Sequence, residues 1–494
     1  MVLAVLLTAL VYAWNLRWVS EDAYISFRYA RNLIEGHGLV FNVGELVEGY
    51  TNFLWTILVA LGLAAGAAPE AVSIALGMGF TTVTFLCLFG LHRRLCGGGN
   101  TVVFPAALLA LALNYSWASY STSGLETSLL SALLAAAFLC LAEWSGSHKA
   151  SKPDNRYLGV GGVLIALAMM TRPDAVLVLP AAVLFILLHR PDRRRTAAHI
   201  LFLAVPLIAA YLPYFIWRLD YYGHMFPNTY YAKSASLPYF GQGLTYLWEF
   251  VSRYFLWVFF PVLLAALWRG FCGRGASNPL VWMMAVYCLL HSLYVVRVGG
   301  DFMEGRLFIP IMPFLYLLIE RSIREVVRLR MVRAFVWAAL ILSTAVNHEV
   351  IEPGRIRRGI TDERSWVPAV KAWYGEGLAF GKHLPSDTIV ATDAVGAFGY
   401  ASRLPIIDTV GLTDETVAHQ PLERRSRPGH EKAARLEYLI SRNAAVLRDG
   451  MNRYYVDRTP AFQYAGNRYF LLTDDKEVVE GFRRAAAELM TGSR

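Results

Sequence analysis

Two adjacent carboxylates, Glu21 and Asp22, follow the first apolar segment and are the residues best suited to chemistry. A carboxylate at the outer mouth of a membrane helix can act as a general base toward a sugar hydroxyl, or can hold a metal ion. The alternative is a cap for the helix expected to start near Ala23. A polar, charged loop is costly to keep at the edge of a bilayer. We therefore interpret residues 20–55 as half of an active site at the membrane surface.

Cationic side chains that could bind a phosphate lie in separate stretches. Arg28 and Arg31 are three residues apart, which puts both on one helical face. Arg306 and Asp301 stand among glycines, which permit close backbone approach, and arginine offers bidentate contacts to phosphate. Lys233 follows an aromatic run. Each has an ordinary alternative, because arginines snorkel toward lipid headgroups or anchor helix ends, and loop lysines are commonly solvated.

Other titratable residues are weaker candidates. His37 and His224 lack partners at metal-ligand spacing, so a satisfied loop histidine is the favoured interpretation of each. Glu126 falls in the first turn of an expected membrane helix, where the helix dipole favours an anion, and it either stabilises that turn or lines a cavity. The five cysteines show no Cys-x-x-Cys spacing, so neither a disulfide framework nor a metal knuckle is implied.

The composition is that of a polytopic membrane protein. Of 494 residues, 56% are hydrophobic and only 17% are charged, and the mean hydropathy is +0.41. A net charge of +9 would fit a nucleic-acid partner, but most surplus Lys and Arg lie in short loops between apolar segments. We therefore interpret them as a topology signal and expect no nucleic acid. Residues 1–12 lack the basic flank and cleavage site of a signal peptide, so an uncleaved first helix is expected.

Apolar segments that could cross a bilayer recur until about residue 347. They fall near 2–16, 52–67, 71–91, 102–114, 124–143, 157–171, 173–189, 198–217, 246–268, 280–296, 304–320 and 331–347. If the basic loops face the cytoplasm, these segments alternate well, except that 52–67 cannot cross. Its length and its glycines favour a re-entrant or interfacial piece on the outer face. The pattern predicts about eleven spans, with the amino terminus inside and the candidate residues on the extracytoplasmic side.

The chain from residue 348 onward is expected to form an extracytoplasmic α/β domain, after a transmembrane domain over residues 1–347. β-Prone runs occur at 388–392, 404–408, 444–447 and 469–472, and residues 476–490 fit a terminal helix. Alternating strands and helices favour a small mixed or parallel sheet. The stretch 396–400 lacks a Gly-x-Gly-x-x-Gly fingerprint, so no nucleotide site is expected there. An enzyme on the outer face has no supply of nucleotide sugars, so glycosyl transfer there would need a lipid-linked donor.

Four motifs together resemble the GT-C fold of polyprenyl-phosphate-dependent glycosyltransferases. They are Glu-Asp-Ala-Tyr-Ile-Ser-Phe-Arg-Tyr at 21–29, Glu-Gly-Tyr-Thr at 48–51, Pro-Asn-Thr-Tyr-Tyr-Ala-Lys at 227–233 and Gly-Leu-Thr-Asp at 411–414. Within that fold the chain is similar, over nearly its whole length, to mycobacterial-type terminal β-(1→2)-arabinofuranosyltransferases and their bacterial relatives. The usual acidic pair of these relatives is Asp-Asp, whereas this chain has Glu21 and Asp22. Asp22 is therefore the stronger catalytic candidate.

The resemblance implies a polyprenyl-phosphate-linked sugar donor, with arabinofuranose as the first choice of sugar, and a cell-envelope glycan or glycoprotein acceptor. Asp22 would engage the acceptor hydroxyl or the reacting centre, and Glu21 is the second catalytic candidate, with its role left open. Arg306, Lys233 and Arg28 would neutralise the leaving phosphate. A divalent cation is left open as a cofactor. The expected substrate contacts are Tyr24, Arg31, His37, Glu48, Tyr50, Asn52, Glu126, Arg172, Asn228, Tyr231, Asp301, Asp393 and Asp414.

Two other functions are compatible with this pattern. An enzyme of the same fold could transfer another pentose, or a hexose such as mannose, to protein or lipid. The alternative from another class is a polytopic lipid or sugar transporter. A transporter would place its charged residues near the bilayer midplane, and here they gather in the predicted outer loops.

Overall fold

The computed structural model describes residues 1–96, 104–147, 154–189, 193–273, 278–345, 366–426, 429–454 and 460–492. The chain divides into two compact units, each with its own packing. The helical unit comprises Met1–Trp18, Ser73–Trp217 and Pro238–Arg355, and the sheet unit comprises Val19–Val72, Arg218–Leu237 and Ile356–Arg494. The predicted domain boundary after residue 347 falls outside the described residues and stays a prediction.

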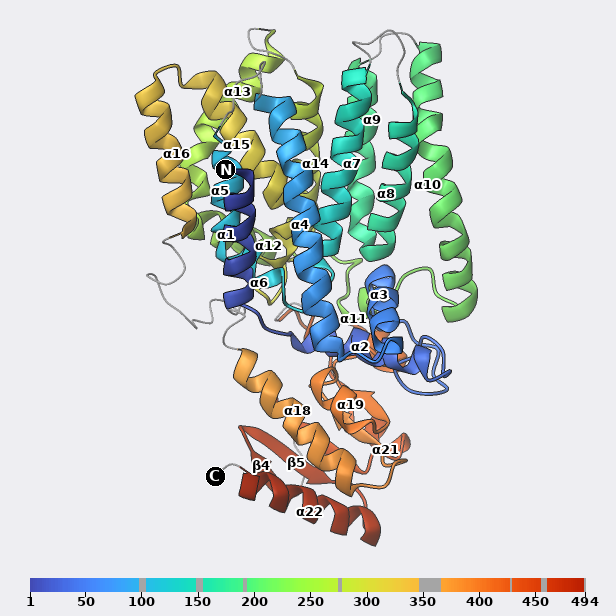
Figure 1. Ribbon diagram of the computed structural model, residues 1–494. Helices are drawn as coiled ribbons and strands as arrows, with labels where there is room; N and C mark the ends of the chain where they lie inside the picture. Colours follow the sequence, from blue (N-terminus) through green and yellow to red (C-terminus); the bar gives the residue numbers. More distant parts are fainter. Residues whose placement is uncertain are drawn as a thin grey trace. The chain divides into compact units, whose positions relative to one another are not determined.

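The helical unit is a bundle of apolar helices (Figure 1). Its elements are α1 (Val2–Asn15), α4 (Pro69–Cys96), α5 (Ala106–Ala112), α6 (Tyr115–Tyr120), α7 (Thr127–Ser147), α8 (Arg156–Thr171), η1 (Pro173–Leu177), α9 (Val178–His189), α10 (Arg193–Tyr222), α12 (Phe240–Arg253), η2 (Leu256–Phe259), α13 (Phe260–Phe271), α14 (Pro279–Val298), η3 (Arg306–Ile311), α15 (Met312–Val326) and α16 (Arg330–Ala345). Helix α7 packs on α8, and α9 packs on α14. Small residues allow close approach: a Cβ on Gly162 of α8 would lie 2.1 Å from the carbonyl oxygen of Leu203 on α10.

Several of these helices have the length and composition of membrane-spanning helices. Among the described residues, four are long and apolar enough to cross one, namely α4, most of α7, α10 from Arg194 onward, and α14. A fifth is added if α12 and the bent η2–α13 segment form one span. The helices confirm the polytopic helical fold that the composition predicted. The count of about eleven spans and the inside position of the amino terminus stay predictions.

Two of the predicted apolar segments are broken rather than straight. The segment 246–268 bends by 80° between α12 and η2, where Phe255 has a φ of 49°. Such a positive φ is costly for a bulky residue and ends the helix there. The segment 304–320 begins as the 3-10 helix η3, which contains Pro310, a residue that has no N–H for an α-helical bond.

In the part of the sheet unit that the structure describes, five strands form one sheet in the order β2-β1-β3-β5-β4. The strands are β1 (Val390–Thr392), β2 (Ile406–Asp408), β3 (Val446–Asp449), β4 (Phe462–Tyr464) and β5 (Asn467–Leu471). Strands β2, β1 and β3 are parallel, and β5 is antiparallel to β3 and β4. In register, Thr392 of β1 lies opposite Asp408 of β2 and Arg448 of β3. The carboxyl ends of these three strands therefore share one edge.

The mixed sheet agrees with the prediction from sequence. All four predicted strands and the terminal helix, α22 (Lys476–Gly492), are present. Strand β4 was not predicted. It joins β5 through the two-residue turn Ala465-Gly466, with φ values of 47° and 81°. Positive φ at both positions is typical of a type I′ hairpin turn, and alanine at the first position hides that signal.

Residues 20–55 contain the helix that was expected to start near Ala23, but this helix is buried rather than exposed at a membrane surface. Helix α2 spans Glu21–Ile34, and every residue from Ala23 to Asn32 is buried. Ile25 and Tyr29 belong to the same hydrophobic cluster as Phe398 of α19 (Ala397–Ser402). The stretch is thus part of the core of the sheet unit, which also holds α11 (Asn228–Ala232), α18 (Trp366–His383), α20 (Glu415–Ala418) and α21 (Leu436–Ser441).

Helix α3 (Phe53–Ala64) follows within the same unit and packs on α2. Just beyond its end, Gly66 has a φ of 83°, and its N–H donates to the carbonyl of Leu63 at 2.8 Å, which closes the helix. Its 12 residues span about 18 Å, less than the roughly 30 Å of a bilayer core. This length agrees with the prediction that 52–67 does not cross. Its place on the outer face stays a prediction.

Candidate active site

The acidic pair opens helix α2. Ser20 caps the helix, and its Oγ accepts the backbone N–H of Ala23 at 3.3 Å. The cap is therefore Ser20, and neither acid fills that role. Glu21 and Asp22 occupy the first turn, where the helix dipole stabilises negative charge.

Glu21 is held by the loop that follows strand β1. Its Oε1 accepts the backbone N–H of Gly396. A Cβ at Gly396 would lie 2.1 Å from the carbonyl oxygen of Glu21, so only glycine allows this approach. Burial, and then the charge of Asp22, raise the pKa of Glu21 to about 8. A carboxyl with such a pKa can exchange a proton near neutral pH.

Aromatic rings line the same helix. Tyr24 lies 5.5 Å from Tyr374 and 5.7 Å from Tyr400, ring centre to ring centre. The guanidinium of Arg31 lies 4.4 Å above the ring of Tyr400 and donates to its carbonyl at 2.8 Å. The predicted contacts Tyr24 and Arg31 are therefore neighbours, and the two tyrosines that join them were not predicted.

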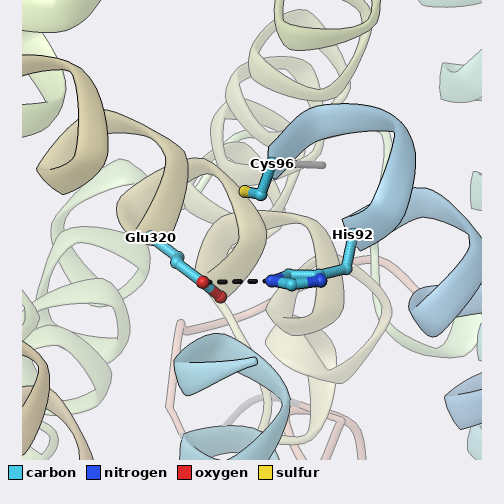
Figure 2. A group of neighbouring side chains, drawn as sticks. All are labelled: His92, Cys96 and Glu320. Carbon is cyan, nitrogen blue, oxygen red and sulfur yellow. Dashed lines mark hydrogen bonds and ion pairs between the residues drawn. The ribbon is translucent and has the colours of Figure 1, made fainter. Parts of the chain in front are cut away.

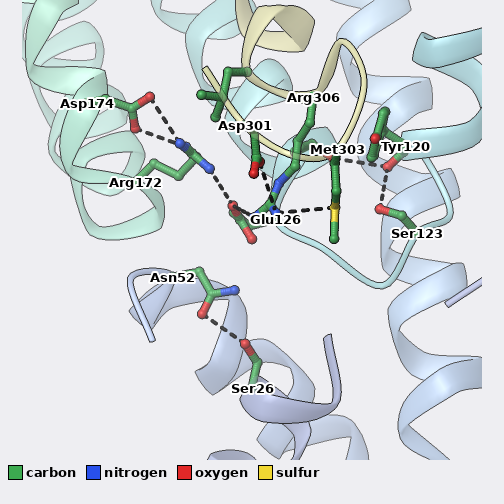
Figure 3. Close-up of polar contacts among 12 residues, drawn as sticks. Ser26, Asn52, Tyr120, Ser123, Glu126, Arg172, Asp174, Asp301, Met303 and Arg306 are labelled. Carbon is green, nitrogen blue, oxygen red and sulfur yellow. Dashed lines mark hydrogen bonds and ion pairs between the residues drawn. The ribbon is translucent and has the colours of Figure 1, made fainter. Parts of the chain in front are cut away.

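The side chain of Asn52 links α2 to the start of α3. Its Oδ1 accepts from Ser26 Oγ at 3.0 Å (Figure 3) and from Thr56 Oγ1 at 3.2 Å. His37 is exposed in the turn after α2. His224 contacts Glu415 at 2.9 Å, in agreement with the interpretation as a satisfied loop histidine.

Arg28 is committed to the packing of the sheet unit. It is 4% exposed, and each of its three guanidinium nitrogens donates within 3.1 Å. The acceptors are the carbonyls of Phe41, Gly399 and Leu404 and the side chain of Asn42. This geometry favours a structural role for Arg28 over phosphate binding.

Two predicted contacts are tied to the end of helix α10. Glu48 forms a bidentate ion pair with Arg218, with N–O distances of 2.9 and 2.6 Å. Burial raises the pKa of Glu48 to about 7, although Arg218 opposes the shift. Tyr50 lies in the core, and its hydroxyl is 3.2 Å from that of Tyr222. Both residues position the loop that follows α2.

The motifs at 227–233 and 411–414 meet in the sheet unit. Asn228 donates to the carbonyl of Gly411, and its own N–H donates to the carbonyl of Glu48 at 2.9 Å. Tyr231 stacks on His419 with ring centres 4.3 Å apart. Lys233, just beyond α11, is exposed, so its ammonium group is accessible to an anion.

The carboxylates at the strand ends serve mainly as local anchors. Asp393, after β1, accepts from Arg448 Nη1 at 2.7 Å. Asp414 caps α20 and accepts from the hydroxyl of Tyr438 at 2.7 Å. Asp408, which was not singled out from the sequence, accepts from three backbone N–H groups of the turn after β2. Its position at the end of a β-prone run is the sequence feature that could have marked it as a candidate.

A second polar cluster lies within the helical unit and brings four predicted residues together (Figure 3). Arg306 Nη1 lies 3.4 Å from Asp301 Oδ2, and its Nη2 lies 4.0 Å from Glu126 Oε1. The same Glu126 oxygen accepts from Arg172 Nη1 at 3.0 Å. Arg172 also pairs with Asp174 at 2.9 Å, a residue that the sequence did not mark as a contact.

Glycines shape the loop that carries Arg306. Gly300 and Gly305 have φ values of 74° and 65°, and a Cβ on Gly300 would lie 2.4 Å from the side chain of Tyr246. The hydroxyl of Tyr246 donates to the carbonyl of Met303 at 2.8 Å. The loop is thus fixed against α12, which orients the buried Arg306 guanidinium.

Two family models match parts of the chain, each less than half of it. Residues 53–217 match the family described as Dolichyl-phosphate-mannose-protein mannosyltransferase. Residues 363–489 match a domain of unknown function, DUF8728.

Two curated relatives carry the same name. The chain is 32% identical over 406 residues to a terminal beta-(1->2)-arabinofuranosyltransferase of Corynebacterium glutamicum, an alignment of 73% of this chain and 57% of the relative. It is 29% identical over 328 residues to the protein of that name from Mycobacterium tuberculosis, covering 60% of this chain and 51% of the relative. The chain thus spans little more than half the length of these relatives.

A solved structure has the same fold. ArnT from Cupriavidus metallidurans, bound to undecaprenyl phosphate, matches with a TM-score of 0.55 at 12% identity, over 82% of this chain and 85% of that chain. A likeness at such low identity shows the fold alone. Together the comparisons confirm the resemblance that the motifs indicated: this chain has the GT-C fold of membrane glycosyltransferases.

Proposed function

We propose that the chain is a membrane glycosyltransferase that transfers arabinofuranose from a polyprenyl-phosphate donor to a cell-envelope glycan. The observation that best supports this sugar is the 32% identity, over 406 residues, to a relative named as a terminal arabinofuranosyltransferase. The four long apolar helices found among the described residues suit a donor whose lipid tail stays in the bilayer. The proposed location of its active site is the extracytoplasmic face of a bacterial inner membrane.

Asp22 is the proposed general base. Its carboxylate takes the proton of the acceptor hydroxyl, the acceptor oxygen bonds to the anomeric carbon, and the polyprenyl phosphate leaves with the electron pair of the broken C–O bond. Glu21 is the proposed positioning residue, because its side chain is bonded to the Gly396 N–H. Its raised pKa, about 8, makes it a poorer carrier of negative charge at neutral pH.

Arg306 is the proposed ligand of the leaving phosphate. Its separations from Asp301 and Glu126, 3.4 and 4.0 Å, exceed the roughly 2.8 Å of a tight charge-assisted bond. The two carboxylates orient the guanidinium, which is the group that would bind the phosphate. Lys233 is the proposed second cation, since it is exposed. Arg28 is left out, because its nitrogens already donate within the sheet unit.

The other candidate contacts divide by their surroundings. Tyr24, Arg31, His37 and Tyr231 are proposed to touch the acceptor glycan or the sugar. The remaining residues are held by the contacts described above and are proposed to position the loops; these are Glu48, Tyr50, Asn52, Glu126, Arg172, Asn228, Asp301, Asp393 and Asp414.

A second candidate function is transfer of a hexose such as mannose. The match of residues 53–217 to the Dolichyl-phosphate-mannose-protein mannosyltransferase family favours it. Membranes that contain the chain can be given labelled polyprenyl-phosphate-arabinose or polyprenyl-phosphate-mannose, with membranes that lack the chain as control. We expect chain-dependent transfer from the arabinose donor. Transfer from the mannose donor alone would replace the first proposal by the second, and transfer from neither would contradict both.

A further inference from the structure

One polar cluster of the helical unit has no part in the proposed transfer. His92 and Cys96 lie on the last turns of α4, and Glu320 lies on α15 (Figure 2). One metal-binding atom from each side chain lies within 4.8 Å of the others. We propose that His92, Cys96 and Glu320 form a binding site for a divalent cation of the Zn²⁺ class.

The donor set supports this choice of ion. His92 and Cys96 are four residues apart on one helix, a spacing that places two ligands on the same face. Imidazole nitrogen, thiolate sulfur and carboxylate oxygen are the three ligand types that Zn²⁺ takes from proteins. Three protein ligands leave the fourth tetrahedral position to a water molecule. Oxygen-preferring ions such as Mg²⁺ would gain little from the thiolate.

The ordinary alternative is that the cluster is a structural hydrogen-bond network. Glu320 Oε1 lies 3.1 Å from His92 Nε2 and accepts from Arg324 Nε at 3.1 Å. Glu320 Oε2 accepts the backbone N–H of Ala107 at 2.9 Å. The buried carboxylate is thus satisfied by hydrogen bonds, which protein interiors require. A binding ion would have to replace the contact between His92 and Glu320.

The charges allow that replacement. Binding of Zn²⁺ would require Cys96 to release its thiol proton to solvent, because only the thiolate is a metal ligand. One thiolate and one carboxylate then carry two negative charges toward the ion, while Glu320 also remains beside the Arg324 guanidinium with which it is ion-paired. Arg324 retains a second acceptor, the carbonyl of Phe104 at 2.8 Å, and so keeps a partner if Glu320 turns toward the ion. The ion would join α4 to α15 and, through Ala107, to the start of α5.

The test uses the full chain, purified in detergent, stripped with a chelator and titrated with Zn²⁺ alone or Co²⁺ alone. We expect one ion per chain, and a Co²⁺ spectrum with the charge-transfer band of a thiolate ligand. Cys96→Ser should abolish the band, and His92→Gln should weaken binding by at least about tenfold. Cys272→Ser is the matched control, because Cys272 is an exposed free cysteine, and it should leave the band unchanged.

A second measurement needs no variant and so remains valid if a substitution disturbs folding. Zn²⁺ should slow alkylation of Cys96, mapped by peptide mass spectrometry, while alkylation of Cys272 keeps its rate. Equal alkylation rates at Cys96 with and without Zn²⁺ would overturn the proposal. So would a folded Cys96→Ser variant that retains the wild-type Co²⁺ spectrum, since the ion would then bind elsewhere.

Discussion

The side chain of Asn228 donates to the backbone carbonyl of Gly411 at 2.9 Å, although 183 residues separate them. The same nitrogen lies 3.0 Å from the carbonyl oxygen of Leu412 and 3.3 Å from that of Asp414. One buried amide therefore joins the motif at 227–233 to the motif at 411–414. Two of the four motifs that carry the family resemblance are therefore joined by one side chain within the sheet unit.

Replacement of Asn228 by Asp should destabilise the protein. The substitution removes the donor and turns a carboxylate toward three carbonyl oxygens, at a cost of about 1–3 kcal/mol. The thermal unfolding midpoint of the purified variant measures this loss. Gln463→Glu makes the same amide-to-carboxylate change at an exposed position of β4 and should leave the midpoint unchanged. An Asn228→Asp midpoint equal to that of Gln463→Glu would contradict the anchoring role.

Gly396→Ala should reduce sugar transfer strongly. The new Cβ would meet the carbonyl oxygen of Glu21 at 2.1 Å, so the first turn of α2 or the loop after β1 must move. Gly375→Ala is the matched control, because nothing lies within 4 Å of its added Cβ in α18. That control should stabilise the helix by roughly 0.5–1 kcal/mol. Equal transfer rates in the two variants would show that the position of the acidic pair does not depend on this contact.

Glu21 should make stability depend on pH. Its pKa is raised from 4.5 to about 8 in the folded chain, so the folded state holds the proton more tightly than the unfolded state. Its contribution to stability is then present at low pH and is lost as pH rises from about 4.5 to about 8. Thermal unfolding between about pH 5 and about pH 8 should therefore show a smaller decline in Glu21→Gln than in the wild type. Glu437→Gln, at an exposed position, should follow the wild-type profile, and a Glu21→Gln profile that does so as well would exclude this effect.

Arg28→Lys should lower stability while the folded enzyme keeps its affinity for the donor. Lysine cannot reproduce the planar set of bonds to Phe41, Gly399 and Leu404, and the loss should be about 2–4 kcal/mol. The unfolding midpoint and the donor KM of the folded fraction measure the two effects separately. The control is Arg403→Lys, at a side chain that is 67% exposed. A raised donor KM with an unchanged midpoint would restore the phosphate-binding role that the sequence indicated.

Local patterns in the sequence predicted much of the fold. Short β-prone runs placed four of the five strands that the structure describes, and the pattern at 476–490 placed the terminal helix, because each depends on neighbouring residues alone. Burial of α2 could not be predicted in this way, since the bond from Arg28 to Gly399 joins residues 371 apart. The first arginine of the family-like motif therefore looked like a phosphate ligand, although its partners are three backbone carbonyls and the side chain of Asn42.

The same limit applies to the candidate sites. Arg306, Asp301, Glu126 and Arg172 were each singled out as separate loop residues, and only the fold shows that they form one cluster. His92 contacts Glu320, which is 228 residues away in the sequence. A search for Cys-x-x-Cys spacing therefore could not reveal the cluster that these two residues form with Cys96. Composition and charge can mark such residues as unusual, but tertiary packing decides which of them meet.

The most direct test of the account is the transfer activity of Asp22→Asn with a labelled polyprenyl-phosphate sugar donor. The change removes the proposed base and keeps the size of the side chain, so transfer should fall by about 10²–10⁴-fold while the donor still binds. Asp387→Asn, at an exposed turn before β1, is the matched control and should retain full activity. If folded Asp22→Asn transfers sugar at the rate of the Asp387→Asn control, then Asp22 is not the base and the central claim is wrong.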